Sequence, residues 1–198
     1  MQAARGTSIT GQTPQTPTHR TAFYRWLFAL VAVAGVATDI LTKRLVVARL
    51  DPESPVRLLG GLLTLRLIRN PGAAFSLGER FTVVFAVLSA CVLVFVVVRL
   101  APRLGHPGWA VALGLLVAGV GGNLTDRIFR APGVLRGHVV DFLQLPHWPI
   151  FNVADMCITS AAVLIMVLSV IKNVGISGER YVKETPPAAP VAEPEPRE

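Results

Sequence analysis

Three aspartates lie beside strongly hydrophobic segments within residues 122–155, in the stretches GNLTDR, GHVVDF and FNVAD. They are Asp126, Asp141 and Asp155. A carboxylate close to a membrane-length apolar segment is energetically expensive, so its presence suggests chemistry. Two neighbouring carboxyl groups cannot both ionise easily and therefore share one proton. One group can then accept a proton from water while the other polarises a carbonyl, which suits peptide hydrolysis without a cofactor.

Other hydrolytic motifs are missing from the sequence or lie in unsuitable places. There is no HExxH motif to hold a metal-bound water, and no Cys/His spacing suits zinc. We therefore expect neither a metal nor a cofactor. A GxSG sequence at residues 175–178 lies in a polar tail, on the face opposite the carboxylates, and we interpret it as a coincidence. Cys91 and Cys157 each lie in an apolar run, which favours buried thiols over a disulfide.

The composition indicates an integral membrane protein. Of the 198 residues, 52% are hydrophobic and only 16% are charged, and the mean hydropathy is +0.55. The net charge is +7, but the basic residues flank apolar runs and form no tract. This pattern favours contact with anionic lipid head groups over nucleic acid.

Four apolar runs predict four membrane-spanning helices: residues 23–37 and beyond, 81–98, the run from Trp109 to about 127, and 150–171. Trp109 is expected at the membrane interface. Residues 51–80 instead alternate apolar and polar positions around Gly60 and Gly61, which predicts a small surface β-sheet. The fold class is therefore an α-helical membrane protein with a sheet between the first two helices. Residues 1–22 and 174–198 are expected to be disordered tails around a membrane domain of residues 23–173, and residues 128–150 a connecting loop.

Four spans would place both termini on one side of the membrane and the conspicuous polar residues on the other. Asp39 and Lys43 are four residues apart at the end of the first helix, so they can pair. The basic residues divide almost evenly between the two faces, and the positive-inside rule gives no orientation. Two alternatives to catalysis remain open. The aspartates could relay protons or ions in a transport protein, or their ion pairs could only hold the helices together.

The ordered set of motifs resembles the lipoprotein signal peptidase family, also called signal peptidase II, of bacterial inner membranes. The resemblance covers about residues 23–171. It rests on Asp39 with Lys43, NPGAAFS at 70–76, GNLTDR at 122–127, VVDF at 139–142 and FNVAD at 151–155. The resemblance implies an intramembrane aspartic endopeptidase that cleaves prolipoproteins just before a diacylglyceryl-modified cysteine.

The resemblance also assigns roles to residues that spacing alone leaves equivalent. It implies that Asp141 and Asp155 are the catalytic pair and that Asp126 is a supporting residue. We expect Asp126 to hold Arg127 and the end of their helix. The other implied site-lining or supporting residues are Asp39, Lys43, Asn70, Gly72, Asn123, Arg127 and Asn152, with Ala74, Gly119 and Gly122 providing close approach. The implied partners are prolipoproteins and membrane lipids, and we expect a monomer. The implied location is the inner membrane, with cytoplasmic termini and a site near the outer face.

Overall fold

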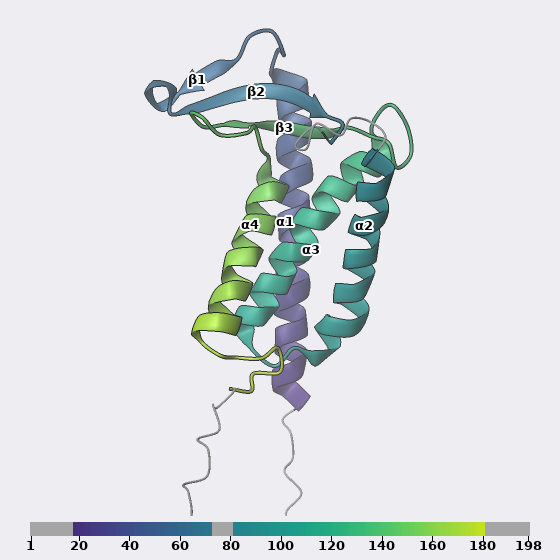
Figure 1. Ribbon diagram of the computed structural model, residues 1–198, viewed down its shortest axis with the longest axis vertical. Coiled ribbons are helices and arrows are strands. Elements are labelled where there is room, and N and C mark those ends of the chain that lie inside the picture. Colours follow the sequence, from purple (N-terminus) through teal and green to yellow (C-terminus); the bar gives the residue numbers. More distant parts are fainter. Residues whose placement is uncertain (1–17, 73–80, 181–198) are drawn as a thin grey trace, which may run out of the picture.

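The computed structural model describes residues 18–72 and 81–180. Its helices lie side by side in a bundle, and a small antiparallel sheet lies across one end of that bundle (Figure 1). The helices are α1 (Thr18–Arg49), α2 (Thr82–Phe95), α3 (Pro107–Phe129) and α4 (Val153–Met166). Short 3-10 or π turns complete the helical part: η1 (Leu59–Gly61), η4 (Val96–Leu100), η5 (Ala101–Arg103) and η6 (Val167–Ile171).

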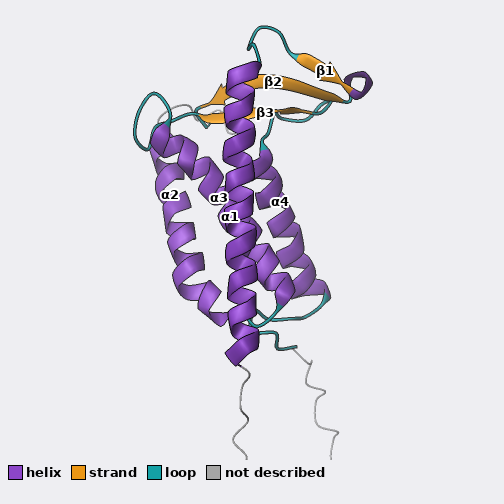
Figure 2. Cartoon of the chain, turned by 180° about the vertical axis from the view of Figure 1, so that it is seen from behind, coloured by secondary structure: helices purple, strands orange, loops and turns teal. Residues whose placement is uncertain are grey.

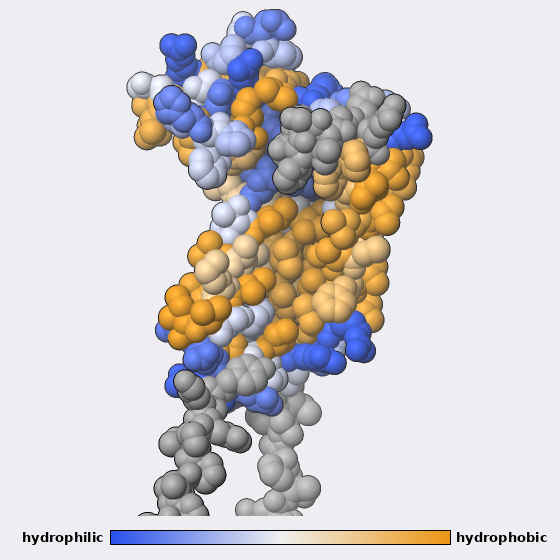
Figure 3. All heavy atoms as spheres, in the orientation of Figure 1, coloured by the Kyte–Doolittle hydropathy of each residue, from blue (hydrophilic) through white to orange (hydrophobic). Residues whose placement is uncertain are grey.

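Three helical segments of the described chain are long and apolar enough to cross a membrane. They are Thr82–Arg103, Pro107–Phe129 and Val153–Ile171, with mean hydropathies of 2.9, 1.5 and 2.2. In the space-filling view, the middle of the bundle is a hydrophobic band between two hydrophilic ends (Figure 3). α1 carries its charged residues towards both ends, outside residues 26–38, and is not among these segments. The fourth span remains a prediction.

α3 is the central helix of the bundle. In its most apolar stretch 61% of residues are buried, against 11% in the segment that contains α2. α1 and α4 both pack against α3. Two of its glycines permit this close approach. A Cβ on Gly119 would lie 2.3 Å from the Ala154 carbonyl oxygen, and one on Gly122 would lie 2.5 Å from Asp39 Oδ2.

The sheet has three antiparallel strands in the order β1 (Val56–Leu58), β2 (Leu63–Asn70) and β3 (Val139–Gln144). The turn between β1 and β2 uses Gly60 and Gly61, whose φ angles of 67° and 98° favour glycine, as the sequence predicted. The third strand corrects the prediction of a connecting loop at residues 128–150. Residues 139–142 of β3 are all buried, so the strand lacks the alternating pattern that identifies a half-exposed strand.

The packed part of the structure extends at both ends into residues that the sequence analysis assigned to the tails. α1 starts at Thr18, so residues 18–22 are helical. At the other end Val174 is buried and its carbonyl accepts a 2.9 Å hydrogen bond from Trp109 Nε1. The Trp109 side chain is therefore buried within the bundle, and its depth in the membrane stays a prediction. The remaining parts of both tails lie outside the described residues.

The two cysteines are free thiols, but only Cys157 is partly buried. Cys91 is exposed on α2 because this helix lies at the periphery of the bundle. The apolar segment around Cys91 therefore faces outward. This finding corrects the prediction that both thiols are buried.

Candidate active site

β3 holds Asp141 at the end of the bundle, almost completely buried at 3% exposure. Asp141 is the register partner of Ile68 in β2, which brings the end of β2 close to it. Asn70 Nδ2 donates a 2.8 Å hydrogen bond to Asp141 Oδ2. Asn152 Nδ2 donates a 2.6 Å hydrogen bond to the other carboxyl oxygen. Both oxygens of Asp141 are therefore oriented by amide side chains from separate elements.

Asp155 is fixed in the first turn of α4 by a reciprocal capping box. The Asn152 side chain accepts a hydrogen bond from the Asp155 backbone N–H at 2.9 Å, and Asp155 Oδ2 accepts one from the Asn152 N–H at 3.1 Å. Asn123 Nδ2 donates a 2.9 Å hydrogen bond to Asp155 Oδ1. Asn152 thus contacts both aspartates. Its side-chain amide contacts Asp141, and the capping box joins it to Asp155. This contact places the two carboxyl groups next to one another.

The two carboxyl groups open into one cavity of about 330 Å³. Asn70, Gly72, Asn123 and Arg127 also line it, so six of the ten predicted site residues surround a common space. The rest of the lining is apolar and consists of Phe85, Val139, Pro149, Ile150 and Phe151. These residues were not predicted from the sequence, because the prediction rested on polar groups. Ala74, with the rest of residues 73–76, lies outside the described residues.

The electrostatics of the cavity favour one proton on the pair. Burial, opposed by the Asn70 hydrogen bond and reinforced by the negative charge of Asp155, raises the pKa of Asp141 to about 6. The guanidinium of Arg127 interacts electrostatically with both carboxylates. The site therefore combines a carboxyl group, Asp141, that binds a proton more readily than an ordinary aspartate with a second carboxyl group, Asp155, and the positive charge of Arg127.

Three of the four remaining predicted residues, Asp39, Lys43 and Asp126, form a buried network centred on Lys43, which is 1% exposed. Lys43 Nζ lies 2.8 Å from Asp39 and 2.9 Å from Asp126, and it donates a 3.1 Å hydrogen bond to Asn123 Oδ1. Asp39 also accepts a 2.9 Å hydrogen bond from the Ala154 N–H at the start of α4. Asp39 and Lys43 pair as the sequence predicted, and together they connect α1, α3 and α4 behind the cavity.

Asp126 does not pair with Arg127, which corrects the prediction from the sequence. Its carboxylate forms ion pairs with Lys43 and Arg130 and accepts a 3.1 Å hydrogen bond from the Val140 N–H. Arg127 donates to the Asn123 carbonyl oxygen at 3.1 Å and lines the cavity. Neighbouring helical residues point about 100° apart, whereas a residue four positions later lies on the same face. Asp126 therefore anchors β3 one residue before Asp141.

Comparisons with known proteins identify the family. A family model described as signal peptidase (SPase) II matches residues 31–171, which is more than half of the chain. The chain belongs to the signal peptidase II family. It is therefore a protease, and with its three apolar helices it is a bacterial membrane protein.

Relatives of the signal peptidase II family from other bacteria are closely similar. A lipoprotein signal peptidase from Rhodococcus jostii is 48% identical over 158 residues, covering 80% of this chain and 78% of the relative. One from Streptomyces griseus is 50% identical over 147 residues, covering 73% of this chain and 74% of the relative.

Two solved structures of a bacterial membrane enzyme, both obtained by the in meso method, share the fold of this chain. One has a TM-score of 0.60 at 27% identity and covers 79% of this chain and 94% of its own. The other has a TM-score of 0.59 at 28% identity, covering 72% and 92%.

Proposed function

We propose that this protein is an aspartic endopeptidase that removes signal peptides from diacylglyceryl-modified prolipoproteins, cleaving just before the lipidated cysteine. One observation carries the proposal: Asp141 and Asp155 line a single cavity, and Asn152 contacts both of them. The names of the relatives support the substrate class.

In the proposed mechanism the two carboxyl groups share one proton, and we place it on Asp141 because burial raises the pKa of this carboxyl group to about 6. Ionised Asp155 accepts a proton from water, and the water oxygen bonds to the peptide carbonyl carbon. Protonated Asp141 donates to the carbonyl oxygen and stabilises its developing negative charge. Asp155 then delivers its proton to the amide nitrogen as the carbon–nitrogen bond breaks. The carbonyl group re-forms at the same time, and its hydroxyl proton returns to Asp141.

The other polar residues position this pair and the substrate. Asn70 and Asn152 orient the Asp141 carboxyl group, and Asn123 orients Asp155. Arg127 lowers the energy of the ionised form of the pair through its charge. On the apolar side of the cavity, Phe85 and Ile150 offer a surface for the lipidated end of the substrate.

We also propose that α1 is the fourth span, that the termini are cytoplasmic and that the site lies near the outer membrane face. The 32 residues of α1 correspond to about 48 Å of helix, longer than a bilayer core of about 30 Å. α1 lies between α2 and α4 when the bundle is viewed from behind (Figure 2). The membrane domain is proposed to cover residues 23–173, extended by the packed segment through residue 180, in a monomer surrounded by lipid.

The substrate claim can be tested with purified protein and a synthetic or recombinant prolipoprotein. We expect cleavage of the diacylglyceryl-modified form and no cleavage of the same chain without the lipid. A shift in gel mobility detects the cleavage. Mass spectrometry of the product should place the lipidated cysteine at its new N-terminus. Equal cleavage of both forms would contradict the proposed lipid requirement, and another cleavage position would contradict the proposed site.

A further inference from the structure

A second cavity, of about 410 Å³, lies between α1 and the end of α3 and shares no lining residue with the candidate active site. Ile40 and Arg44 line it from α1, and Thr125, Asp126 and Phe129 line it from α3. Arg130, the residue that ends α3, completes the lining.

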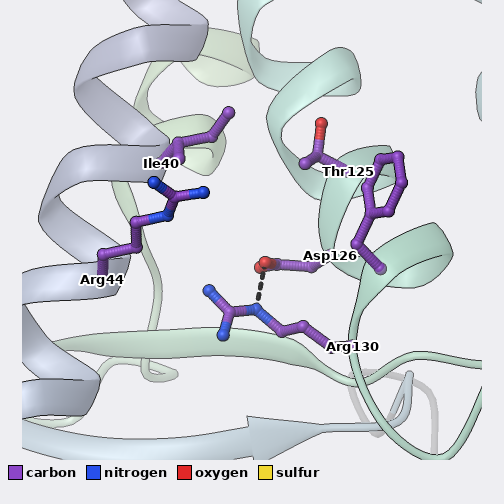
Figure 4. Close-up of a pocket in the computed structure, with 6 residues that line it drawn as sticks. Ile40, Arg44, Thr125, Asp126 and Arg130 are labelled. Carbon is purple, nitrogen blue, oxygen red and sulfur yellow. Dashed lines mark hydrogen bonds and ion pairs between the residues drawn. The ribbon is translucent and has the colours of Figure 1, made fainter.

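The cavity holds two guanidinium groups with unused hydrogen-bond donors. Arg44 and Arg130 both extend into the space between the helices (Figure 4). Arg130 pairs with Asp126 through Nε, which leaves its two terminal nitrogens directed elsewhere. Within residues 18–72 and 81–180, Arg44 makes no hydrogen bond or ion pair.

The charges around this cavity do not balance. The charged residues that line the cavity are Arg44, Arg130 and Asp126, which gives two positive charges and one negative charge. One positive charge is in excess, beside a buried network. A single anion with several oxygen acceptors would neutralise it, and guanidinium groups match phosphate oxygens well.

The position of the cavity indicates where such an anion would come from. A candidate membrane span ends at Phe129, and Arg130 follows it directly. The Phe129 side chain is 80% exposed and, with Ile40, gives the cavity an apolar wall. The cavity therefore places two cationic side chains, the exposed Arg44 and the partly exposed Arg130, at the edge of the hydrophobic band, as a lipid head group adjoins its acyl chains.

We propose that this cavity binds an anionic phospholipid. Arg44 and Arg130 donate to the phosphate diester, and an acyl chain lies along Ile40 and Phe129. A phosphate diester in an anionic lipid carries one negative charge, which matches the excess charge of the cavity. A zwitterionic head group carries a positive charge of its own, which would lie close to the two arginines, so such a lipid is disfavoured.

The test uses the full-length protein, delipidated in detergent and titrated with phosphatidylglycerol, with bound lipid counted by native mass spectrometry. Arg44→Gln should weaken the tightest phosphatidylglycerol site by about tenfold, the loss expected for one charge-assisted contact. Arg49→Gln is the matched control, because Arg49 is exposed on the same helix and lies outside the cavity. It should change the affinity by less than about twofold. Equal losses in the two variants would overturn the proposal in favour of general surface charge.

Two further arms separate a lipid from a free phosphate. Phe129→Ser should weaken phosphatidylglycerol binding, because the apolar wall is lost. Phosphatidylcholine and inorganic phosphate should each compete poorly with phosphatidylglycerol. Competition by inorganic phosphate as strong as by a short-chain phosphatidylglycerol, together with no effect of Phe129→Ser, would show a free-phosphate site and contradict the lipid assignment. Unchanged thermal unfolding midpoints of the three variants would show that they are folded.

Discussion

Asn152 is the residue on which the geometry of the candidate pair depends most directly. Its side-chain amide donates to Asp141 and also to Asn123 Oδ1, at 2.6 and 3.2 Å. Its backbone N–H and side-chain oxygen hold Asp155 in the capping box. The two aspartates come from a strand and a helix, so one buried residue that contacts both keeps their separation constant.

The raised pKa of Asp141 gives a prediction for the pH dependence of cleavage. The proposed mechanism needs a proton on the pair, and the pKa of Asp141 is about 6. Raising the pH through this value removes the proton, so kcat/KM should fall as the pH rises above about 6, approaching tenfold per unit. Initial rates at substrate concentrations well below KM, over the neutral and alkaline range, measure this. A profile that is flat across that range, with the enzyme still folded, would contradict a proton held on Asp141.

Asp126→Asn separates a supporting carboxylate from a catalytic one. The substitution keeps the size of the side chain but removes the ion pairs with Lys43 and Arg130, so β3 is held less firmly. We expect reduced but measurable cleavage and a loss of roughly 3 kcal/mol in stability, typical of a broken buried pair. Thermal unfolding and gel-shift cleavage measure the two effects. Complete loss of cleavage in a protein of unchanged stability would make Asp126 catalytic.

At the scale of elements, α1, α3, α4 and β3 converge on the site because small residues let the helices approach closely. Gly122 of α3 faces the Asp39 carboxylate of α1, which in turn accepts a hydrogen bond from the first turn of α4. The position of the carboxylates therefore depends on close packing as well as on their own hydrogen bonds.

Gly122→Ala tests this packing. The new Cβ would lie 2.5 Å from Asp39 Oδ2, so α1 or α3 must shift, and overpacking of this kind costs about 1–3 kcal/mol. The unfolding midpoint and the cleavage rate should both fall. Gly133→Ala is the matched control, because a Cβ there meets nothing within 4 Å. Equal behaviour of the two variants would show that close approach at Gly122 is unimportant.

The sequence predicts the elements whose side chains follow a local pattern. The apolar runs gave the positions of α2, α3 and α4, and the alternation around Gly60 and Gly61 gave β1 and β2. The sequence pattern did not reveal β3, because residues 139–142 are uniformly buried and do not alternate. It also did not reveal the partner of Asp126, since which cation meets a carboxylate depends on how α1 packs against α3. The resemblance distinguished Asp141 and Asp155 from Asp126, which spacing alone could not do.

At the scale of the whole molecule, the sheet and the beginning of α1 lie at opposite ends of the bundle (Figure 1). A hydrophobic band separates these two ends (Figure 3). The candidate site is at the end with the sheet, so the proposed orientation places the sheet outside the cytoplasm.

Cysteine accessibility tests this orientation. Glu53 precedes β1, and Glu179 lies in the segment that packs at the other end. In a background with Cys91 and Cys157 replaced by Ser, Glu53→Cys should react with a membrane-impermeant thiol reagent in spheroplasts. Glu179→Cys should react only after the membrane is opened. The reverse labelling pattern would contradict the proposed orientation, and labelling of both would contradict the three spans proposed between Glu53 and Glu179.

The most direct test of the central claim is cleavage of a diacylglyceryl-modified prolipoprotein by purified Asp141→Asn and Asp155→Asn variants, beside the unmodified protein. Asparagine keeps the size of each side chain and removes its ability to accept a proton. We expect each substitution to abolish cleavage while expression and the unfolding midpoint remain close to those of the unmodified protein. Full processing of the substrate by either variant would contradict a catalytic pair formed by Asp141 and Asp155.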